Sequence, residues 1–569
     1  MPYIPQQNRD QIMMCSLDSL VAPDSIVRVI DAFTASLDLV ALGFTKSTAA
    51  SEGRPAYDPR ILLGLYIYGY RKTIRSSRKL EEACRVNIEA KWLMGGLEPD
   101  FRTISDFRKD NADHLKSVFH EFNKRLAAIE LPTGFVSIDG SKFQAWNAKD
   151  ANFTANKLDD RIAWLNQHTD EYLRLLESLD AMEESEAEGM LTKEEVQAKL
   201  AEAKERLERY TAYRQYMEKN GLAQLSVTDV NSRLMKSKNG FMVAYNVQTA
   251  IDSETHLIRD FQVTNHVTDH GLLESTATPL HKEGEILDLT ADKGYDKAED
   301  MIRCLEQGIV PHVILPDGQD TYEFEIEYRE GEADLSSQQA EDLNRALHAG
   351  KIPEAYRDVI PKTEIIKKKT WVSDEEVSGN TEQSIYGTEE EMKARAAEGY
   401  FVRDPERNIV YCPAKETLRQ KSIKKNGMIR YANRAACRRC PYRDQCFKGK
   451  LEWKEIDFSK DTLEIPNRHW LKKSEKSLPK KSRGKGHFET IKIVRLTFKP
   501  KRSLMEKRMC LSEHPFGTIK RSMEADYFLL CGLMKTTAEF ALFGLGYNLQ
   551  RALNLLGFKE LMRAMAYII

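Results

Sequence analysis

The hydrophobic pattern of the first 130 residues is helical. Pro59 opens a long apolar segment, and proline suits a first helical turn because its missing N–H would be unpaired there. A turn followed by a helix is expected over residues 75–82, and a third helix from Thr103 or Ser105. The pattern predicts an all-helical N-terminal domain over residues 1–130.

Two longer helical stripes follow. From Ile162 to Leu179 apolar positions recur at spacings of three and four, which is typical of a helix packed along a partner. Thr192 and Glu195 have the spacing of a capping box, which opens a second helix. The two stripes predict an antiparallel helical hairpin over residues 155–220, inserted after the first strand of the next domain.

The pattern then changes to short strands. β-rich segments lie at 135–138, 241–250 and 256–263, and the last two flank a good hairpin turn. A helix, a strand at 285–290, a second helix and a strand at 309–315 follow. Strand order β-β-β-α-β-α-β, with an acid on the first and fourth strands, is the ribonuclease H-like plan.

The chain of 569 residues is too long for one core. We predict an α/β protein whose ribonuclease H-like (retroviral-integrase-like) core consists of residues 131–316 and 500–569. Residues 317–499 are expected to form a mixed insertion that carries a cysteine cluster and a basic stretch.

Composition indicates a soluble globular protein, with 41% hydrophobic and 30% charged residues. The first residues lack the pattern of a secretory signal, and the apolar segment 527–545 contains Lys535 and Glu539, so it is expected to be a buried helix and not a membrane span. We therefore expect a cytoplasmic protein without membrane contact.

The net charge of −2 does not by itself indicate a nucleic-acid partner. Lysine and arginine are nevertheless concentrated between Arg468 and Arg508, and a local basic track is what phosphate binding requires. The alternative is a solvated linker. The stretch includes four closely spaced basic residues as candidate DNA contacts: Lys480, Lys481, Arg483 and Lys485.

Four of the nine cysteines lie within 35 residues: Cys412, Cys437, Cys440 and Cys446. Clustered thiols in a cytoplasmic protein favour tetrahedral zinc over disulfides. The neighbouring arginines and lysines are expected to lower the thiol pKa values. We predict a structural Zn²⁺ at these four residues, with free thiols as the alternative.

Three acids stand in local settings suited to a metal ion: Asp139 after the first strand, Asp292 after the fourth, and Glu513 on a late helix. Oxygen-rich clusters suit Mg²⁺. Gly140 follows Asp139 directly, and Gly294 lies two residues after Asp292. A glycine beside each aspartate is expected where a bulky group must come close to the carboxylate. The three acids together predict metal-assisted phosphoryl transfer on DNA.

Positive charge accompanies the third acid. Lys520 lies seven residues after Glu513, two helical turns along the same face, so that a carboxylate and a phosphate-binding ammonium would point together. Arg508 and Arg521 add positive charge nearby.

These residues resemble those of bacterial insertion-sequence transposases of the DDE type. The matching group has a D-x-G-Y second motif and an E-x6-K third motif, here Asp292–Tyr295 and Glu513–Lys520. The similarity also covers the cysteine block and further segments: 53–59, 92–97, 101–108 and 513–517. One departure concerns the group's upstream Tyr and Arg, whose places hold Glu506 and Met509, with Arg508 one residue out of register.

The resemblance implies an enzyme that cuts the ends of its own mobile element and joins the freed 3′-OH to target DNA. Asp139, Asp292 and Glu513 fall on the catalytic positions, where they would hold two Mg²⁺ (or Mn²⁺) ions, with Asp139 bridging both. Lys520, Arg508, Arg521 and Tyr295 would be auxiliary contacts to DNA or phosphate.

The partners implied are double-stranded DNA, namely terminal inverted repeats and target, and further copies of the chain in a homodimer or higher assembly at the nucleoid. Arg75, Arg78 and Lys79 of the N-terminal domain are candidate DNA contacts, with a dimerisation module as the alternative. Two other functions stay open: a structure-selective nuclease that cuts without joining, and a non-catalytic DNA-binding derivative.

Overall fold

The structure is a computed structural model of the 569-residue chain. It describes the following residues: 10, 14–48, 55–181, 192–237, 240–315, 319–328, 338–373, 389–405, 407–424, 428–447, 453–459, 462–467, 469–470 and 486–566. Two compact units divide the chain, one of residues 1–366 and 492–569, the other of residues 367–491.

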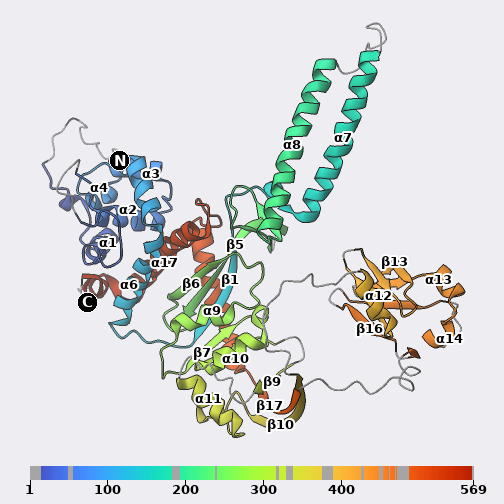
Figure 1. Cartoon of the computed structure of the whole chain (residues 1–569). Coiled ribbons are helices and arrows are strands. Elements are labelled where there is room, and N and C mark those ends of the chain that lie inside the picture. The colour runs from blue at the N-terminus through green and yellow to red at the C-terminus, as the bar shows by residue number, and fades with distance from the viewer. Residues whose placement is uncertain are drawn as a thin grey trace, which may run out of the picture. The chain divides into compact units, whose positions relative to one another are not determined.

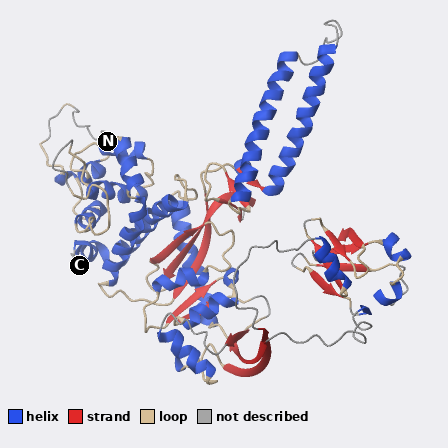
Figure 2. Cartoon of the chain, in the orientation of Figure 1, coloured by secondary structure: helices blue, strands red, loops and turns tan. Residues whose placement is uncertain are grey.

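A mixed sheet lies at the centre of the larger unit (Figures 1 and 2). β1 is central; β5 and then β6 pair on one side in antiparallel fashion, and β7 and then β8 on the other side in parallel. β4 extends the edge of β5. The strands are β1 (Val136–Gln144), β4 (Arg233–Ser237), β5 (Gly240–Asp252), β6 (Ile258–Thr264), β7 (Leu287–Ala291) and β8 (Ile309–Val313). This mixed α/β order is consistent with the predicted ribonuclease H-like core.

Side chains of β1 point alternately to the two faces of this sheet, and each face packs into a different hydrophobic cluster. Ile138 packs with β7, β8 and the helices α9 (Leu273–Ala277) and α10 (Ala298–Glu306). Phe143 is an odd number of positions away from Ile138 along the strand and packs on the opposite face with α6 (Leu115–Ala127) and α17 (Leu533–Ala566). Because Asp139 and Phe143 differ by an even number, Asp139 belongs to the face of the sheet that the late helices cover.

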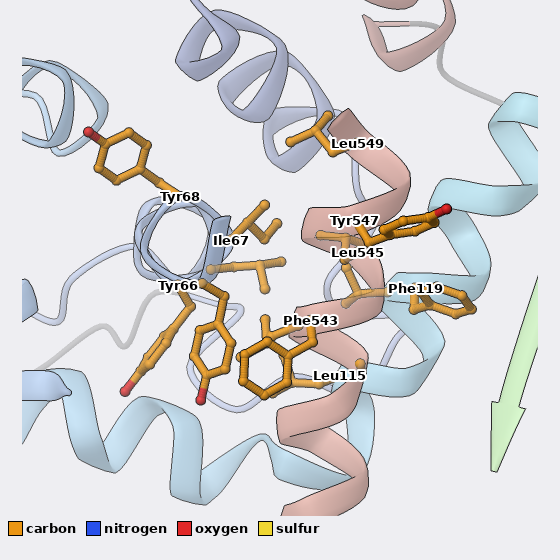
Figure 3. Packing of buried hydrophobic residues seen from close by; sticks show 14 of the residues in the cluster. Tyr66, Ile67, Tyr68, Leu115, Phe119, Phe543, Leu545, Tyr547 and Leu549 are labelled. Carbon is orange, nitrogen blue, oxygen red and sulfur yellow. The ribbon is translucent and has the colours of Figure 1, made fainter. Parts of the chain in front are cut away.

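The N-terminal helices share one hydrophobic cluster with that face and with α17 (Leu533–Ala566), which is interrupted at Gly557. Figure 3 shows Tyr66 and Ile67 of α2 packed with Phe119 of α6 and Phe543 of α17. The helices are α1 (Ile26–Ala35), α2 (Pro59–Arg71), α3 (Ser77–Val86), α4 (Ile88–Leu93), α5 (Phe101–Asp110) and α6 (Leu115–Ala127).

The predicted start of α2 at Pro59 is confirmed, with the Asp58 side chain accepting from the Arg60 amide at 2.8 Å. α5 starts at Phe101, before both predicted starts, Thr103 and Ser105, because Asp100 caps it by accepting from the Thr103 amide. Within the described residues, no helix is long and apolar enough to cross a membrane.

The predicted hairpin consists of α7 (Ala155–Ala181) and α8 (Lys193–Lys219), which run side by side (Figure 1). The capping box at Thr192 and Glu195 is confirmed, since both reciprocal hydrogen bonds are present. A short pair of strands, β2 (Asn152–Thr154) and β3 (Gln224–Ser226), joins the base of the hairpin.

Part of the expected insertion belongs to the larger unit. β9 (Tyr322–Tyr328) pairs with β17 (Gly486–Phe498), which pairs with β10 (Lys362–Ser373). α11 (Gln338–His348) contributes Leu343 and Leu347 to the core cluster that these strands join. β10 and β17 lead into and out of the smaller unit.

The smaller unit is built on an antiparallel sheet, in the order β15-β14-β13-β12-β11-β16, around Phe401, Leu418 and Phe458. Its elements are α12 (Glu389–Ala397), β11 (Tyr400–Asp404), β12 (Ile409–Tyr411), β13 (Thr417–Ile423), β14 (Ile429–Ala432), α13 (Arg434–Arg439), α14 (Arg443–Cys446), β15 (Glu455–Phe458) and β16 (Glu464–Pro466).

Candidate active site

Asp139 stands in the middle of β1. The sequence had suggested that it lies at the end of the strand, and this expectation is wrong. The apolar run stops at Ile138, but β1 continues to Gln144 because it keeps its antiparallel pairing with β5 over that length. The parallel pairing with β7 joins Val136 to Leu289 and Ser137 to Thr290. Extended by two residues, this register brings Asp139 level with Asp292.

Asp292 is the first residue after β7 and caps the short turn Lys293–Tyr295, its side chain accepting from the Lys293 amide at 2.8 Å. Half of the Asp292 side chain is exposed, whereas Asp139 is largely covered. The two aspartates thus meet at the carboxyl end of β7, one at the surface and one beneath it.

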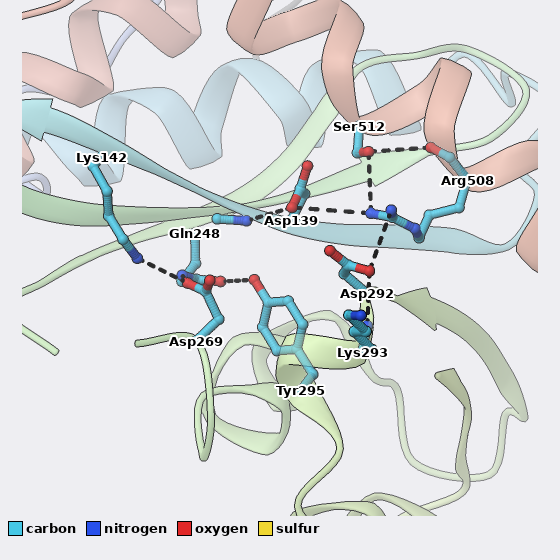
Figure 4. Close-up of polar contacts among 10 residues, drawn as sticks. Asp139, Lys142, Gln248, Asp269, Asp292, Lys293, Tyr295, Arg508 and Ser512 are labelled. Atoms are coloured by element: carbon cyan, nitrogen blue, oxygen red, sulfur yellow. Dashed lines mark hydrogen bonds and ion pairs between the residues drawn. The ribbon is translucent and has the colours of Figure 1, made fainter. Parts of the chain in front are cut away.

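Arg508 of α16 (Arg502–Gly517) lies between the two aspartates (Figure 4). Its guanidinium is 4.0 Å from a carboxylate oxygen of Asp139 and 3.7 Å from one of Asp292. The Arg508 side chain is only 11% exposed. A largely buried cation that touches both carboxylates shows that the site is built to hold positive charge between them.

Burial raises the pKa of Asp139 above its ordinary value, while the Arg508 charge, the Gly140 amide and the Ser512 hydroxyl oppose the shift. The Gly140 amide donates to Asp139 at 2.9 Å. Ser512 is fully buried one turn after Arg508 on α16. Asp139 is therefore an acid whose charged form depends on nearby cations and donors.

Glu513 lies on α16 beside Ser512 but is exposed. Within the described residues, no three His, Cys, Asp or Glu side chains lie close enough together to hold a metal ion. The structure thus brings Asp139 and Asp292 together and does not add Glu513 to them.

The predicted two-turn helical spacing between Glu513 and Lys520 is wrong. α16 ends at Gly517, and a π-helical turn, Thr518–Ser522, follows; such turns change the angular spacing of side chains and are frequent at functional sites. Lys520 consequently turns to β1, where its ammonium donates to the Lys142 carbonyl at 2.6 Å and lies 4.5 Å from the Phe143 ring centroid.

A polar network that sequence reasoning missed ties the Asp292 loop to β1 (Figure 4). The Tyr295 hydroxyl donates to the Gln248 side chain, whose amide donates to Asp269 at 2.8 Å. Asp269 also accepts from Lys142 at 3.2 Å and from Asn246 at 2.7 Å. Tyr295 is buried, and burial raises its pKa well above the usual range.

This network also explains Gly140. A Cβ at that position would lie 2.4 Å from Asp269 Oδ1 and 2.5 Å from Gln248 Nε2. The bulky group expected beside the first aspartate is thus the protein's own Asp269. Its only sequence signal is an acid in the segment between β6 and α9.

Asp269→Asn is expected to slow DNA cleavage about tenfold to a hundredfold. All three donors reach Asp269 Oδ1, so the Asn carbonyl oxygen can still accept from them, but the negative charge that pairs with Lys142 at 3.2 Å is lost. A hydrogen bond to a charged group contributes about 1.5–3 kcal/mol. Because the Asp292 loop would loosen, the metal concentration for half-maximal cleavage should rise as well. Cleavage rates across a metal titration check this.

The matched control for this change is Glu299→Gln on α10, whose side chain is 68% exposed. Equal cleavage and an equal metal requirement in Asp269→Asn and the wild type would contradict the positioning role. A lowered melting temperature alone, with unchanged metal dependence, would leave Asp269 a purely structural residue.

The four clustered cysteines line one cavity in the smaller unit. Burial raises the pKa of Cys412 to about 11 and also raises the pKa of Cys446, where the opposing charge of Lys454 is the smaller effect. For these two thiols the expected lowering of the pKa by neighbouring cations is wrong. These thiols are among the described residues, in which no three His, Cys, Asp or Glu side chains are grouped so that they could hold a metal ion. The structure thus gives the predicted zinc no support, and zinc stays a prediction.

The candidate DNA contacts have different outcomes. Arg75 is 6% exposed, donates to the Tyr527 carbonyl at 2.9 Å and lies 4.0 Å from Glu539, so its predicted place on a DNA-binding surface is wrong. Arg78, Lys79 and Arg521 are exposed. The other four lie outside the described residues: Lys480, Lys481, Arg483 and Lys485.

The fold and this site define a mixed α/β protein, consistent with a ribonuclease H-like core, that carries paired aspartates beside a basic helix. Three family models match the chain. A Transposase domain (DUF772) covers residues 15–110, and models described as Transposase DDE domain cover residues 228–384 and 411–553. The chain is an insertion-sequence transposase of the DDE type, a DNA-cleaving and strand-transferring enzyme.

The two DDE matches contain Asp292 and Glu513 but not Asp139. Asp139 is therefore singled out by the strand register and by its contact with Arg508. No curated protein and no solved structure matches the chain.

Proposed function

We propose that this transposase cuts the DNA at the ends of its own mobile element and joins the freed 3′-OH to target DNA, at a metal site made by Asp139, Asp292 and Glu513. The observation that carries the proposal is the level placement of Asp139 and Asp292 on either side of the Arg508 guanidinium. Glu513 is on the same helix as Arg508 and is open to solvent.

The donor set fits Mg²⁺ or Mn²⁺, since carboxylate oxygens are the ligands that these ions prefer. Asp139 and Asp292 would hold the ions, and we propose Glu513, on the same helix as Arg508, as the third carboxylate of the set. Bound metal supplies activation of the attacking water or 3′-OH and stabilisation of the leaving oxygen.

The remaining residues of the site position substrate and carboxylates. Arg508 offsets the charge of Asp139 and Asp292 and would contact the phosphate once metal shares that charge. Lys520, held against β1 through the Lys142 carbonyl, would fix a phosphate near the cut. Tyr295, buried and bonded to Gln248, holds the Asp292 loop in place and does not reach the DNA itself.

Other parts of the chain supply candidate contacts to duplex DNA. Arg78 and Lys79 are exposed on α3, and Arg521 is exposed on the π-helical turn. Lysine and arginine bind backbone phosphates without reading sequence. We propose that terminal-repeat specificity lies in residues 1–130, and that a homodimer or higher assembly pairs the two element ends.

Strand transfer is the activity that tests the proposal. Purified protein, Mg²⁺, a duplex of one element end with its 3′-OH already exposed, and a supercoiled plasmid should yield covalently joined products. The same end with a 3′-dideoxy terminus is the control, because it lacks the attacking hydroxyl. Nicked plasmid without joined product would favour a nuclease that cuts without joining, and absence of both would favour a DNA-binding derivative.

A further inference from the structure

An open cavity of about 380 Å³ lies in the larger unit, and its lining includes His514, the residue after Glu513. One wall is a stripe of α16 and the π-helical turn that follows it: His514, Thr518 and Ser522. His514 directly follows Glu513, and Lys520 lies within the same stretch of helix. DNA that contacts Glu513 would therefore pass next to the wall made by His514.

The other walls bring two arginines from distant parts of the chain. Arg71 ends α2, and Arg551 lies on α17. The helices approach closely at Gly546, where an added Cβ would lie 3.0 Å from the Met523 side chain and 3.5 Å from the Arg71 Cα. Because the helices lie this close together, Arg71 and Arg551 line the same cavity.

The lining of the cavity is positively charged, with Arg71 and Arg551 among its residues. None of the ten residues that line it is acidic. Burial lowers the pKa of His256, which lies near Arg551 and His514, and the charges of these two residues lower it further, while Asp252 and Glu254 oppose the shift. An anion is the ligand that such a surface favours.

The donors are held in place. Arg551 donates from Nε to the Thr255 carbonyl at 2.8 Å, and Arg71 donates from its terminal nitrogen to Gln550. The Nε of Arg71 is buried and has no hydrogen-bond partner among the described residues, a state that costs about 1–3 kcal/mol if nothing else binds it. Held arginines suit phosphate because their planar donors match its oxygens.

We infer that this cavity binds a backbone phosphodiester of the transposon-end or target DNA, through Arg71 and Arg551, beside the strand undergoing reaction. The inference rests on the proposed function, since it takes DNA as the substrate. It assigns DNA contacts to Arg71 at the end of α2 and to Arg551 on α17.

Phosphate-ethylation interference tests the inference in a binding experiment. The parent protein carries Asp292→Asn, so that the DNA is bound and not cut. Two variants are added to this parent. Arg551→Gln removes one guanidinium, and Asn554→Asp places a carboxylate in the cavity while keeping an acceptor for the Gln550 amide, 3.0 Å away.

The matched control is Arg563→Gln, which changes the charge by the same amount on the same helix. Its side chain is 76% exposed, pairs with Glu560 and does not line the cavity. The Asn554→Asp variant keeps the test decisive even if Arg551→Gln fails to fold, because it retains every buried contact of Arg551.

Both variants are expected to bind element ends about tenfold to a hundredfold more weakly, as loss of a charge-assisted hydrogen bond would give. One or two phosphates should drop out of the interference pattern, and the log–log salt slope should flatten by about 0.9 for each. The control should match the parent in all three measurements.

An interference pattern and salt slope in both variants equal to those of the control would overturn the inference. Inorganic phosphate that raises the melting temperature of the parent but not of Asn554→Asp, with an unaltered DNA pattern, would assign the cavity to free phosphate and also overturn it. Because the readout is binding by an uncleaving parent, its failure is separate from a failure of the strand-transfer assay.

Discussion

Asp292→Asn is expected to lower DNA cleavage by at least about a thousandfold while leaving binding to element ends within about twofold. The change removes a metal-binding charge and almost no volume, and metal stabilisation of the transition state is worth several kcal/mol. Asp139→Asn and Glu513→Gln should have effects of the same order. Chelation of divalent metal should abolish cleavage by the wild type.

Cleavage of a labelled element end, with binding measured in parallel by mobility shift, checks these outcomes. Glu506→Gln is the matched control because Glu506 lies on α16 with an exposed side chain and pairs only with Arg502 among the described residues. Retention of more than about a tenth of wild-type cleavage by Asp292→Asn would contradict the assignment of Asp292 as a catalytic residue.

Glu539→Ala is expected to destabilise the larger unit by roughly 3–5 kcal/mol, the cost of leaving a buried charge partner alone. Glu539 is fully buried on α17 and accepts from the Leu529 and Leu530 amides at 3.0–3.2 Å. Burial raises the pKa of Glu539, while Arg108 and Arg75 oppose that shift. Truncation to Ala would leave both arginines without their buried counter-charge and both backbone amides without an acceptor.

Urea unfolding followed by tryptophan fluorescence measures this loss. Glu539→Gln should cost less than Glu539→Ala, because an amide oxygen can still accept from the two backbone amides. Glu560→Ala on the same helix is the control, since its side chain is 56% exposed and pairs with Arg563 at the surface. Equal stability of Glu539→Ala and the control would refute a structural role for this buried pair.

The order of the core elements could be predicted because it depends on local pattern. Strand segments beginning near 135, 241, 256, 285 and 309 all appear in the sheet as β1, β5, β6, β7 and β8. The helical hairpin and its capping box were likewise present in the spacing of apolar and capping residues. Such signals come from periodicity within one element, which needs no knowledge of its neighbours.

Arg75 shows where that reasoning fails. A run of arginine and lysine at residues 71–79 resembles a DNA-binding surface, but Arg75 faces Glu539, more than 450 residues away in the chain. The neighbouring Arg78 and Lys79 are exposed. Which residue of a basic run is buried depends on the partner that covers one side of the helix, and sequence spacing alone does not identify that partner.

The sequence by itself determined the mixed α/β class, the order of strands and helices, and the three acids that resemble a DDE triad. Only the tertiary structure decided that Asp139 stands level with Asp292 across Arg508, that Asp269 fills the space beside Gly140, and that a π-helical turn sends Lys520 to β1. The physical reason is that periodicity and capping act within a few residues. Strand register, helix packing and the burial of charge instead depend on contacts between segments that are distant in the chain.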